Sequence, residues 1–152
     1  MIGEDHTPES HLIPIVLQVA LGQRKEIFIY GNDYPTADGT CIRDYIHVDD
    51  LGRAHVKALE RLEPGKGIEA NLGTGTGTSV REVIGACREV TGHEIPATVS
   101  ERRPGDPPEL VANSDLAQKI LEWKPEFMTI RPIVESAWRW HKANPKGYAT
   151  NS

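Results

Sequence analysis

The stretch Tyr30–Leu51, YGNDYPTADGTCIRDYIHVDDL, decides how this chain folds. A short apolar run, Ile27–Tyr30, stops at a loop rich in Gly, Asn, Asp and Pro, the residues that favour turns. An alternating strand is expected around Arg43–Val48, and Asp49–Asp50 have the composition of a helix N-cap. Arg43 is therefore predicted at the rim of a strand, beside a long polar loop.

An arginine in such a place suits an anionic, ring-bearing ligand. The guanidinium of Arg43 offers a planar pair of donors to a phosphate, and Tyr45 adds an aromatic ring or a hydroxyl on the same rim. On spacing alone, the alternative is a surface arginine in an ion pair with its neighbour Asp44.

The rest of the chain alternates between helical and extended patterns, which favours an α/β fold. The predicted helices cover residues 10–22, 50–62, 80–91, 114–121 and 131–143. The predicted strands cover 27–30, a segment ending near 48, 68–72 and 97–100, with a brief extension at 110–112.

Composition fits one ordinary domain with a modest core. The chain has 152 residues and 38% hydrophobic residues, and its net charge of −5 argues against a nucleic-acid surface. No apolar run reaches membrane-spanning length and the N-terminus has no signal-peptide pattern, so a cytoplasmic location without a membrane partner is expected. Cys41 and Cys87 lie far apart, and reduced thiols are favoured over a single disulfide.

The histidines show no metal-ligand spacing, so no metal site is predicted. His6 with Glu4 and Asp5 is compatible with a cation, but a frayed N-terminus is the simpler interpretation.

The only glycine cluster, Gly73–Gly77, does not have the spacing of a dinucleotide-binding turn. Its glycines recur every second residue, and the segment is better explained as a sharp strand-to-helix turn with Ser79 capping the next helix. We therefore assign no cofactor-binding residue to this cluster.

The chain resembles the UDP-glucose 4-epimerases of the extended short-chain dehydrogenase/reductase superfamily. Besides the Tyr30–Leu51 stretch, the segments that carry the resemblance are Glu9–Pro14, Ala70–Val80, Arg102–Asp106, and Ala137–His141 with Gly147 and Tyr148. They cover nearly the whole chain, in family order. The resemblance extends only to the C-terminal half of such an enzyme.

The resemblance implies an α/β substrate domain without the N-terminal NAD-binding sheet. Residues 1–152 would form a single UDP-sugar-binding domain, and residues about 49–72 are expected to pack on a Rossmann domain outside this chain. The family uses NAD to interconvert UDP-glucose and UDP-galactose through a 4-keto intermediate. The catalytic pair of the family is Tyr-x-x-x-Lys, and no tyrosine in this chain is followed four positions later by a lysine. This chain alone is therefore expected to have no catalytic and no cofactor-binding residue, to bind no NAD and to be inactive.

The resemblance also assigns roles to individual residues. Arg43 and Arg103 correspond to clamps on the pyrophosphate, Asp106 to the acceptor for the ribose hydroxyls, and Tyr30 to a residue framing the uracil. Leu110 stands where the family sets the room for an N-acetyl group, so UDP-N-acetylhexosamines join UDP-glucose and UDP-galactose as expected ligands. The remaining substrate-side positions are His11, Leu12, Tyr45 and Val80.

Two other functions stay open at this point. One is a fragment of a related nucleotide-sugar dehydratase or decarboxylase, and the other is a non-catalytic UDP-sugar-binding module. If the helix face of residues 50–62 stays uncovered, homo-oligomerisation is expected; otherwise the missing half is the partner that covers it.

Overall fold

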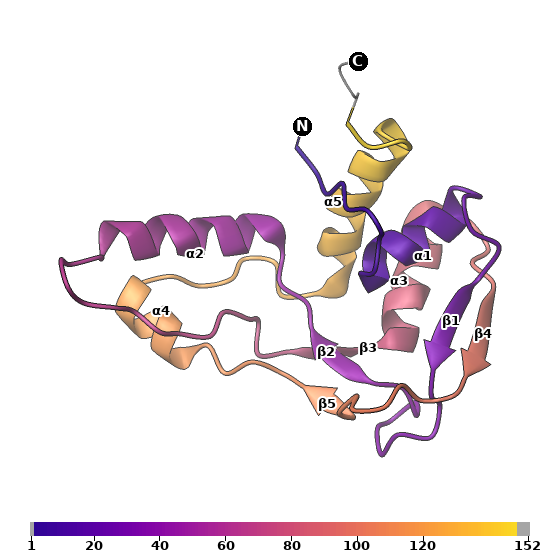
Figure 1. Ribbon diagram of the computed structural model, residues 1–152, viewed down its shortest axis with the longest axis horizontal. Coiled ribbons are helices and arrows are strands. Elements are labelled where there is room, and N and C mark those ends of the chain that lie inside the picture. The colour runs from indigo at the N-terminus through magenta and orange to yellow at the C-terminus, as the bar shows by residue number, and fades with distance from the viewer. Residues whose placement is uncertain (1, 149–152) are drawn as a thin grey trace.

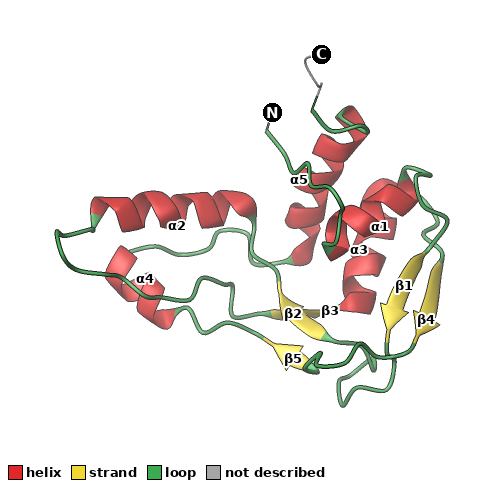
Figure 2. Ribbon diagram, viewed as in Figure 1, coloured by secondary structure: helices red, strands yellow, loops and turns green. Residues whose placement is uncertain are grey.

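A computed structural model describes residues 2–148 and shows a mixed α/β fold with two small sheets (Figures 1 and 2). In the main body, strand β1 (Ile27–Tyr30) pairs in parallel with β4 (Ala97–Ser100). Three helices pack beside this pair: α1 (Leu12–Ala20), α3 (Val80–Thr91) and α5 (Ile130–Ala143).

The second sheet joins the body to an arm. Its central strand β2 (Ile42–Asp44) lies between β3 (Gly77–Ser79), which is antiparallel to it, and β5 (Glu109–Leu110), which is parallel. The arm consists of α2 (Val48–Glu60) and α4 (Asp115–Leu121), which lie side by side and project to the left in Figure 1.

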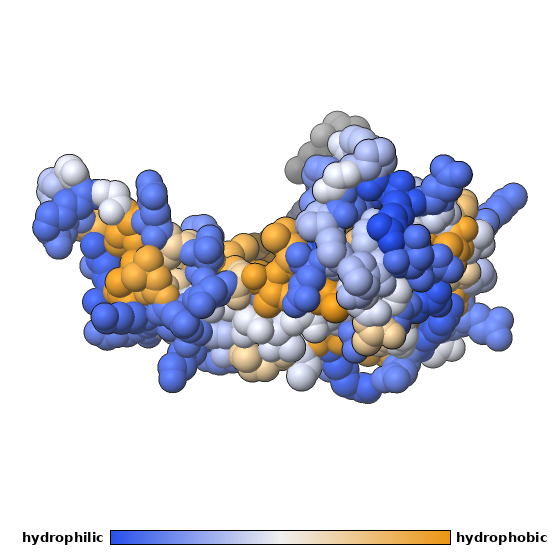
Figure 3. All heavy atoms as spheres, turned by 90° about the horizontal axis from the view of Figure 1, so that it is seen from below, coloured by the Kyte–Doolittle hydropathy of each residue, from blue (hydrophilic) through white to orange (hydrophobic). Residues whose placement is uncertain are grey.

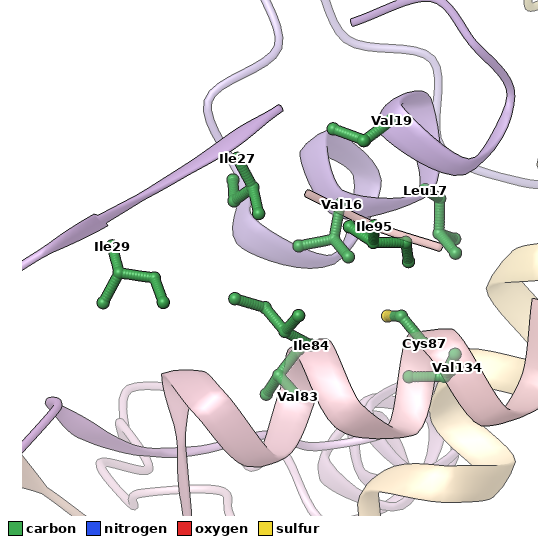
Figure 4. Close-up of a cluster of buried hydrophobic side chains, with 10 residues drawn as sticks. All are labelled: Val16, Leu17, Val19, Ile27, Ile29, Val83, Ile84, Cys87, Ile95 and Val134. Carbon is green, nitrogen blue, oxygen red and sulfur yellow. The ribbon is translucent and has the colours of Figure 1, made fainter. Parts of the chain in front are cut away.

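The hydrophobic core lies between α1, α3 and the β1–β4 pair, where apolar side chains from the helices and strands face one another (Figure 4). Its buried members are Val16, Leu17, Val19, Ile27, Ile29, Val83, Ile84, Cys87, Ile95 and Val134. A smaller cluster of Ala54, Ala117, Leu121 and Trp123 holds the arm together. The body therefore has its own core, while the arm has only a thin one.

Helix α3 begins and ends as its sequence predicts. Ser79 and Glu82 form a capping box, in which the Ser79 hydroxyl accepts from the Glu82 N–H and the Glu82 carboxylate accepts from the Ser79 N–H. Gly92, with φ of 71°, closes the C-terminal end in the left-handed region that glycine favours. Such a cap stabilises a helix by about 1 kcal/mol.

Helix α2 begins earlier than predicted, and its N-cap is His47 rather than Asp49–Asp50. The Nδ1 atom of His47 accepts a hydrogen bond from the Asp49 N–H at 3.0 Å. Asp50 is instead fully buried and accepts from the backbone N–H groups of Glu126 and Phe127, both at 3.0 Å. Asp50, which is predicted to cap its own helix, instead anchors the loop at Glu126 and Phe127 to helix α2.

Two predicted strands are wrong in extent. β2 ends at Asp44 instead of continuing to residue 48, because helix α2 already begins at Val48. Residues 68–72 form no strand, since no neighbouring strand within residues 2–148 offers them a hydrogen-bonding edge.

The arm exposes an apolar helix face. Val48, Val56 and Leu59 of α2 are 72%, 55% and 69% exposed, and Leu116 of α4 is exposed as well. Figure 3 shows apolar atoms at the surface of the arm, and a hollow between the arm and the body. Among the residues that the structure describes, no helix is long and apolar enough to cross a bilayer.

Candidate functional site

Five of the predicted site residues meet where the ends of β1, β2 and β5 approach one another: Tyr30, Arg43, Arg103, Asp106 and Leu110. Arg43 and Leu110 are register partners in the parallel β2–β5 pair. Asp106 lies between the two arginines, with its carboxylate 3.7 Å from Arg43 Nη2 and 2.9 Å from Arg103 Nε. The Arg103 guanidinium carbon lies 5.0 Å from the centre of the Tyr30 ring.

The two arginines are held differently. Arg43 Nη1 donates to the carbonyl oxygens of Ile42 at 2.8 Å and Pro107 at 3.0 Å, and only 24% of its side chain is exposed. Arg103 is 61% exposed and is held by Asp106 and the Tyr30 ring. Arg43 is thus held in one position by backbone carbonyls, whereas Arg103 keeps most of its N–H donors facing solvent.

The arrangement brings two cations to one anion. A guanidinium presents parallel N–H donors that match carboxylate or phosphate oxygens, and these charge-assisted bonds are the strong ones. Asp106 occupies the position in which both arginines can reach a single anionic group. The interpretation of Arg43 as the ion-pair partner of Asp44 is wrong, because its carboxylate partner is Asp106.

The loop between β1 and β2 is fastened to α3 by Asp38. Its carboxylate accepts from the Thr40 N–H at 2.8 Å, from the Thr40 hydroxyl at 2.7 Å and from the Ser79 hydroxyl at 2.5 Å. Burial alone would raise the pKa of Asp38, but the bonds from Ser79 and Thr40 outweigh it and lower the pKa. At Gly39, with φ of 78°, any Cβ would collide with the carbonyl of Asn32. The loop that leads to Arg43 therefore has little freedom.

The glycine turn at residues 73–77 surrounds a carboxylate of the chain itself. Asp44 accepts from the N–H groups of Thr74 and Gly75, both at 3.0 Å, from the Thr74 hydroxyl at 2.7 Å and from the Ala112 N–H at 3.3 Å. Gly75 has a φ of 72°. Since this turn already binds Asp44, it has no free N–H nest for a dinucleotide phosphate. The glycine turn of this chain therefore does not fit the phosphates of NAD.

The other predicted residues lie apart from these five, and no hydrogen bond or ion pair among the described residues joins the two groups. His11 precedes α1 and is exposed, while Leu12 and Val80 open α1 and α3 and pack against the core. Tyr45 also packs on the core, and burial raises its pKa to about 12. Their substrate roles stay predictions.

The sequence pattern missed Asp38 and Asp44 as the residues that fix the site's framework. Both stand in segments rich in turn residues, where Asp ordinarily signals a local turn. Nothing in the spacing indicates that Asp44 binds Thr74, 30 residues later, or that Asp38 binds Ser79, 41 residues later.

The chain is similar to known proteins over nearly its whole length. The NAD-dependent epimerase/dehydratase family model matches residues 1–73. The UDP-glucose 4-epimerase of Halalkalibacterium halodurans is 59% identical over 152 residues, which is 99% of this chain and 46% of that protein. That of Lacticaseibacillus casei is 53% identical over 97% of this chain and 45% of its own length.

The chain is similar to part of the UDP-glucose 4-epimerases. A crystal structure of UDP-glucose 4-epimerase superposes with a TM-score of 0.92 at 56% identity, covering 98% of this chain and 46% of that one. The Bifidobacterium longum UDP-glucose 4-epimerase, in complex with NAD⁺ and UDP, gives a TM-score of 0.86 at 44% identity, covering 91% of this chain and 41% of that one. This chain therefore spans less than half the length of the UDP-glucose 4-epimerases that it matches.

Proposed function

We propose that this chain is the C-terminal, UDP-sugar-binding half of a UDP-glucose 4-epimerase. The observation that carries the proposal is the convergence of Arg43 and Arg103 on Asp106, at positions that the resemblance gives to the nucleotide clamp. The similarity to epimerases over 99% of the chain supports it.

Four of the five clustered residues bind different parts of the nucleotide. Arg43 and Arg103 bind the pyrophosphate, and Tyr30 frames the uracil at the end of β1. When Arg103 turns to the phosphates, the carboxylate of Asp106 is released to accept bonds from the ribose hydroxyls, while Arg43 keeps the position that the carbonyls of Ile42 and Pro107 give it.

The other predicted residues and Leu110 take the roles that the resemblance implies. His11 and Leu12 lie beside the nucleotide, Val80 packs on the base, Tyr45 supports the rim, and Leu110 faces the sugar. Bound NAD⁺ in the complete enzyme supplies the transient oxidation at the sugar C4. This chain's part would be to hold UDP fixed while the sugar turns.

The exposed face of the arm is the docking surface for the N-terminal half. Val48, Val56 and Leu59 present a row of apolar side chains on α2, and residues 68–72 lack a strand partner in the described chain. The matched epimerases are more than twice as long as the region they share with this chain. Their remaining part corresponds to the N-terminal half that would cover this face. Burying each such side chain contributes about 1.5–3 kcal/mol.

A calorimetric titration with UDP tests the nucleotide clamp. Saturable binding is expected, and Arg103→Ala should weaken it about tenfold or more, because one charge-assisted bond contributes about 1.5–3 kcal/mol. Arg131→Ala is the matched control, since Arg131 is 59% exposed and pairs with Glu89 and Glu135 away from the site.

A chimera tests the complete activity. The part of the Halalkalibacterium halodurans enzyme that precedes the matched region would be joined to this chain, since 59% identity makes the interface compatible. We expect conversion of UDP-glucose to UDP-galactose, lost with Arg103→Ala. A folded chimera that binds no UDP refutes the proposal, and a dehydrated or decarboxylated product would favour the related enzymes instead.

A further inference from the structure

The segment before α1 gathers histidine and glutamate side chains that take no part in the proposed UDP clamp of Arg43, Arg103 and Asp106. His6, Glu9 and His11 each offer one ligand atom, and these atoms all lie within 4.8 Å of one another. The rings of His6 and His11 are 5.2 Å apart between centroids. The spacing His-x-x-Glu-x-His places all three on one short turn of chain.

Negative charge converges on one nitrogen of this cluster. His11 Nδ1 lies 2.8 Å from Glu4 Oε1 and 2.9 Å from Glu9 Oε1. A ring nitrogen carries at most one proton, so two carboxylates share a position that a cation would satisfy better. Residues 2–11 contain Glu4, Asp5 and Glu9 but no lysine or arginine, so no basic side chain of the segment competes for them.

The backbone around the cluster is tied down. Glu9 Oε1 accepts from the N–H groups of Ser10 and His11, both at 2.8 Å, and only 6% of the Glu9 side chain is exposed. The carbonyl of Glu4 accepts from the Trp140 indole at 2.9 Å. The expectation of a frayed N-terminus is therefore wrong for this segment, which is docked on α5.

We propose that His6, Glu9 and His11 bind a divalent transition-metal ion, with Glu4 as a further oxygen ligand. Two imidazoles with a carboxylate suit Zn²⁺, whereas Mg²⁺ and Ca²⁺ select all-oxygen sites. Zn–N and Zn–O distances of about 2.0–2.2 Å require the ligand atoms to close in by rotation of the exposed imidazoles. Of the three ligands, only His11 is also assigned to the proposed nucleotide surface, so the tests below substitute His6 and Glu9.

Titration of the untagged chain with Zn²⁺ tests the proposal. We expect one ion per chain, and at least about tenfold weaker binding for His6→Ala and for Glu9→Gln, each of which removes a ligand. His55→Ala is the matched control, because His55 is exposed on α2 and should leave binding unchanged. His6 is exposed, so its loss should leave the far-ultraviolet circular dichroism unaltered.

Cobalt substitution gives a second readout. Bound Co²⁺ should show visible d–d bands without a thiolate charge-transfer band, because the ligands are nitrogen and oxygen and both cysteines are buried. The proposal is overturned by absence of saturable Zn²⁺ binding, by binding that His6→Ala leaves intact, or by a thiolate band.

Discussion

The carboxylate of Asp44 accepts hydrogen bonds from both the backbone N–H and the hydroxyl of Thr74, at 3.0 and 2.7 Å. Further bonds from Gly75 and Ala112 close the glycine turn around this one side chain. Asp44 is the last residue of β2 and follows Arg43 directly. The position of Arg43, the proposed phosphate clamp, therefore depends on a neighbouring carboxylate whose oxygens are already bonded to this turn and to Ala112.

Asp44→Ala should destabilise the chain by about 2–4 kcal/mol, because several backbone donors lose a charged acceptor at once. Urea denaturation monitored by tryptophan fluorescence measures the change. Asp49→Ala is the control, since the Asp49 side chain is 71% exposed. Equal effects of the two substitutions would mean that the turn holds its shape without Asp44.

Local signals predicted the fold where a single segment contains its own determinants. The capping box of Ser79 and Glu82 and the stop at Gly92 lie within one helix, so α3 follows from the sequence alone. The start of α2 does not follow from the sequence alone. The Nε2 atom of its cap, His47, is hydrogen-bonded to Ser136 on α5 at 2.8 Å, and the His47 ring stacks on Phe127. Its role as a cap depends on partners about 80 to 90 residues away.

The candidate site divides in the same way. Arg43 could be singled out by its place at a strand rim, but its partner Asp106 lies 63 residues later in sequence, and only the resemblance connected the two. The alternative ion pair between Arg43 and Asp44 rests on adjacency alone, and the structure instead pairs Arg43 with Asp106. A carboxylate that binds backbone N–H groups leaves no charge pattern in the sequence.

Asp38 should make stability sensitive to acid. Its pKa in the folded chain is lowered by Ser79 and Thr40 against the effect of burial. A group with a lowered pKa contributes stability above its unfolded pKa, near 4, and loses it as pH falls through the folded value. Asp38→Asn should therefore lower stability at neutral pH and show a smaller further loss below about pH 4. Unchanged acid sensitivity in this variant, measured by thermal melting across pH, would contradict the assignment.

Cys87 should be unreactive in the native chain. It is fully buried, and burial raises its pKa to about 12, so the thiolate that reacts with disulfide reagents is scarce. The raised pKa contributes stability that is complete below the unfolded value and is lost as pH rises toward 12. Thiol titration before and after unfolding in urea checks this. If the folded Cys41→Ala variant still reacts rapidly with the thiol reagent, Cys87 must be accessible and the prediction is wrong.

The apolar face of α2 should bind hydrophobic dye in the isolated chain. Replacing Val56 and Leu59 together by lysine removes exposed apolar surface without touching the core, since both are more than half exposed. Dye fluorescence and any self-association seen by sedimentation should both fall. Met128→Lys, which alters an exposed apolar side chain outside the arm, is the control. Equal loss in the two variants would show that the dye does not report the docking face.

Leu110 should tune which sugar the complete enzyme accepts. It is 62% exposed and pairs with Arg43 across β2 and β5, so its side chain stands beside the proposed pyrophosphate clamp. A leucine is smaller than a tyrosine, which leaves room for an N-acetyl group on the sugar. In the chimeric enzyme, Leu110→Tyr should lower kcat/KM for UDP-N-acetylglucosamine by about 10-fold or more, a cost of about 1.4 kcal/mol, while UDP-glucose is turned over as before. Leu110→Ala should leave both substrates active and serves as the matched control for side-chain replacement. The assignment of Leu110 fails if the tyrosine variant epimerises both sugars as well as the parent chimera does.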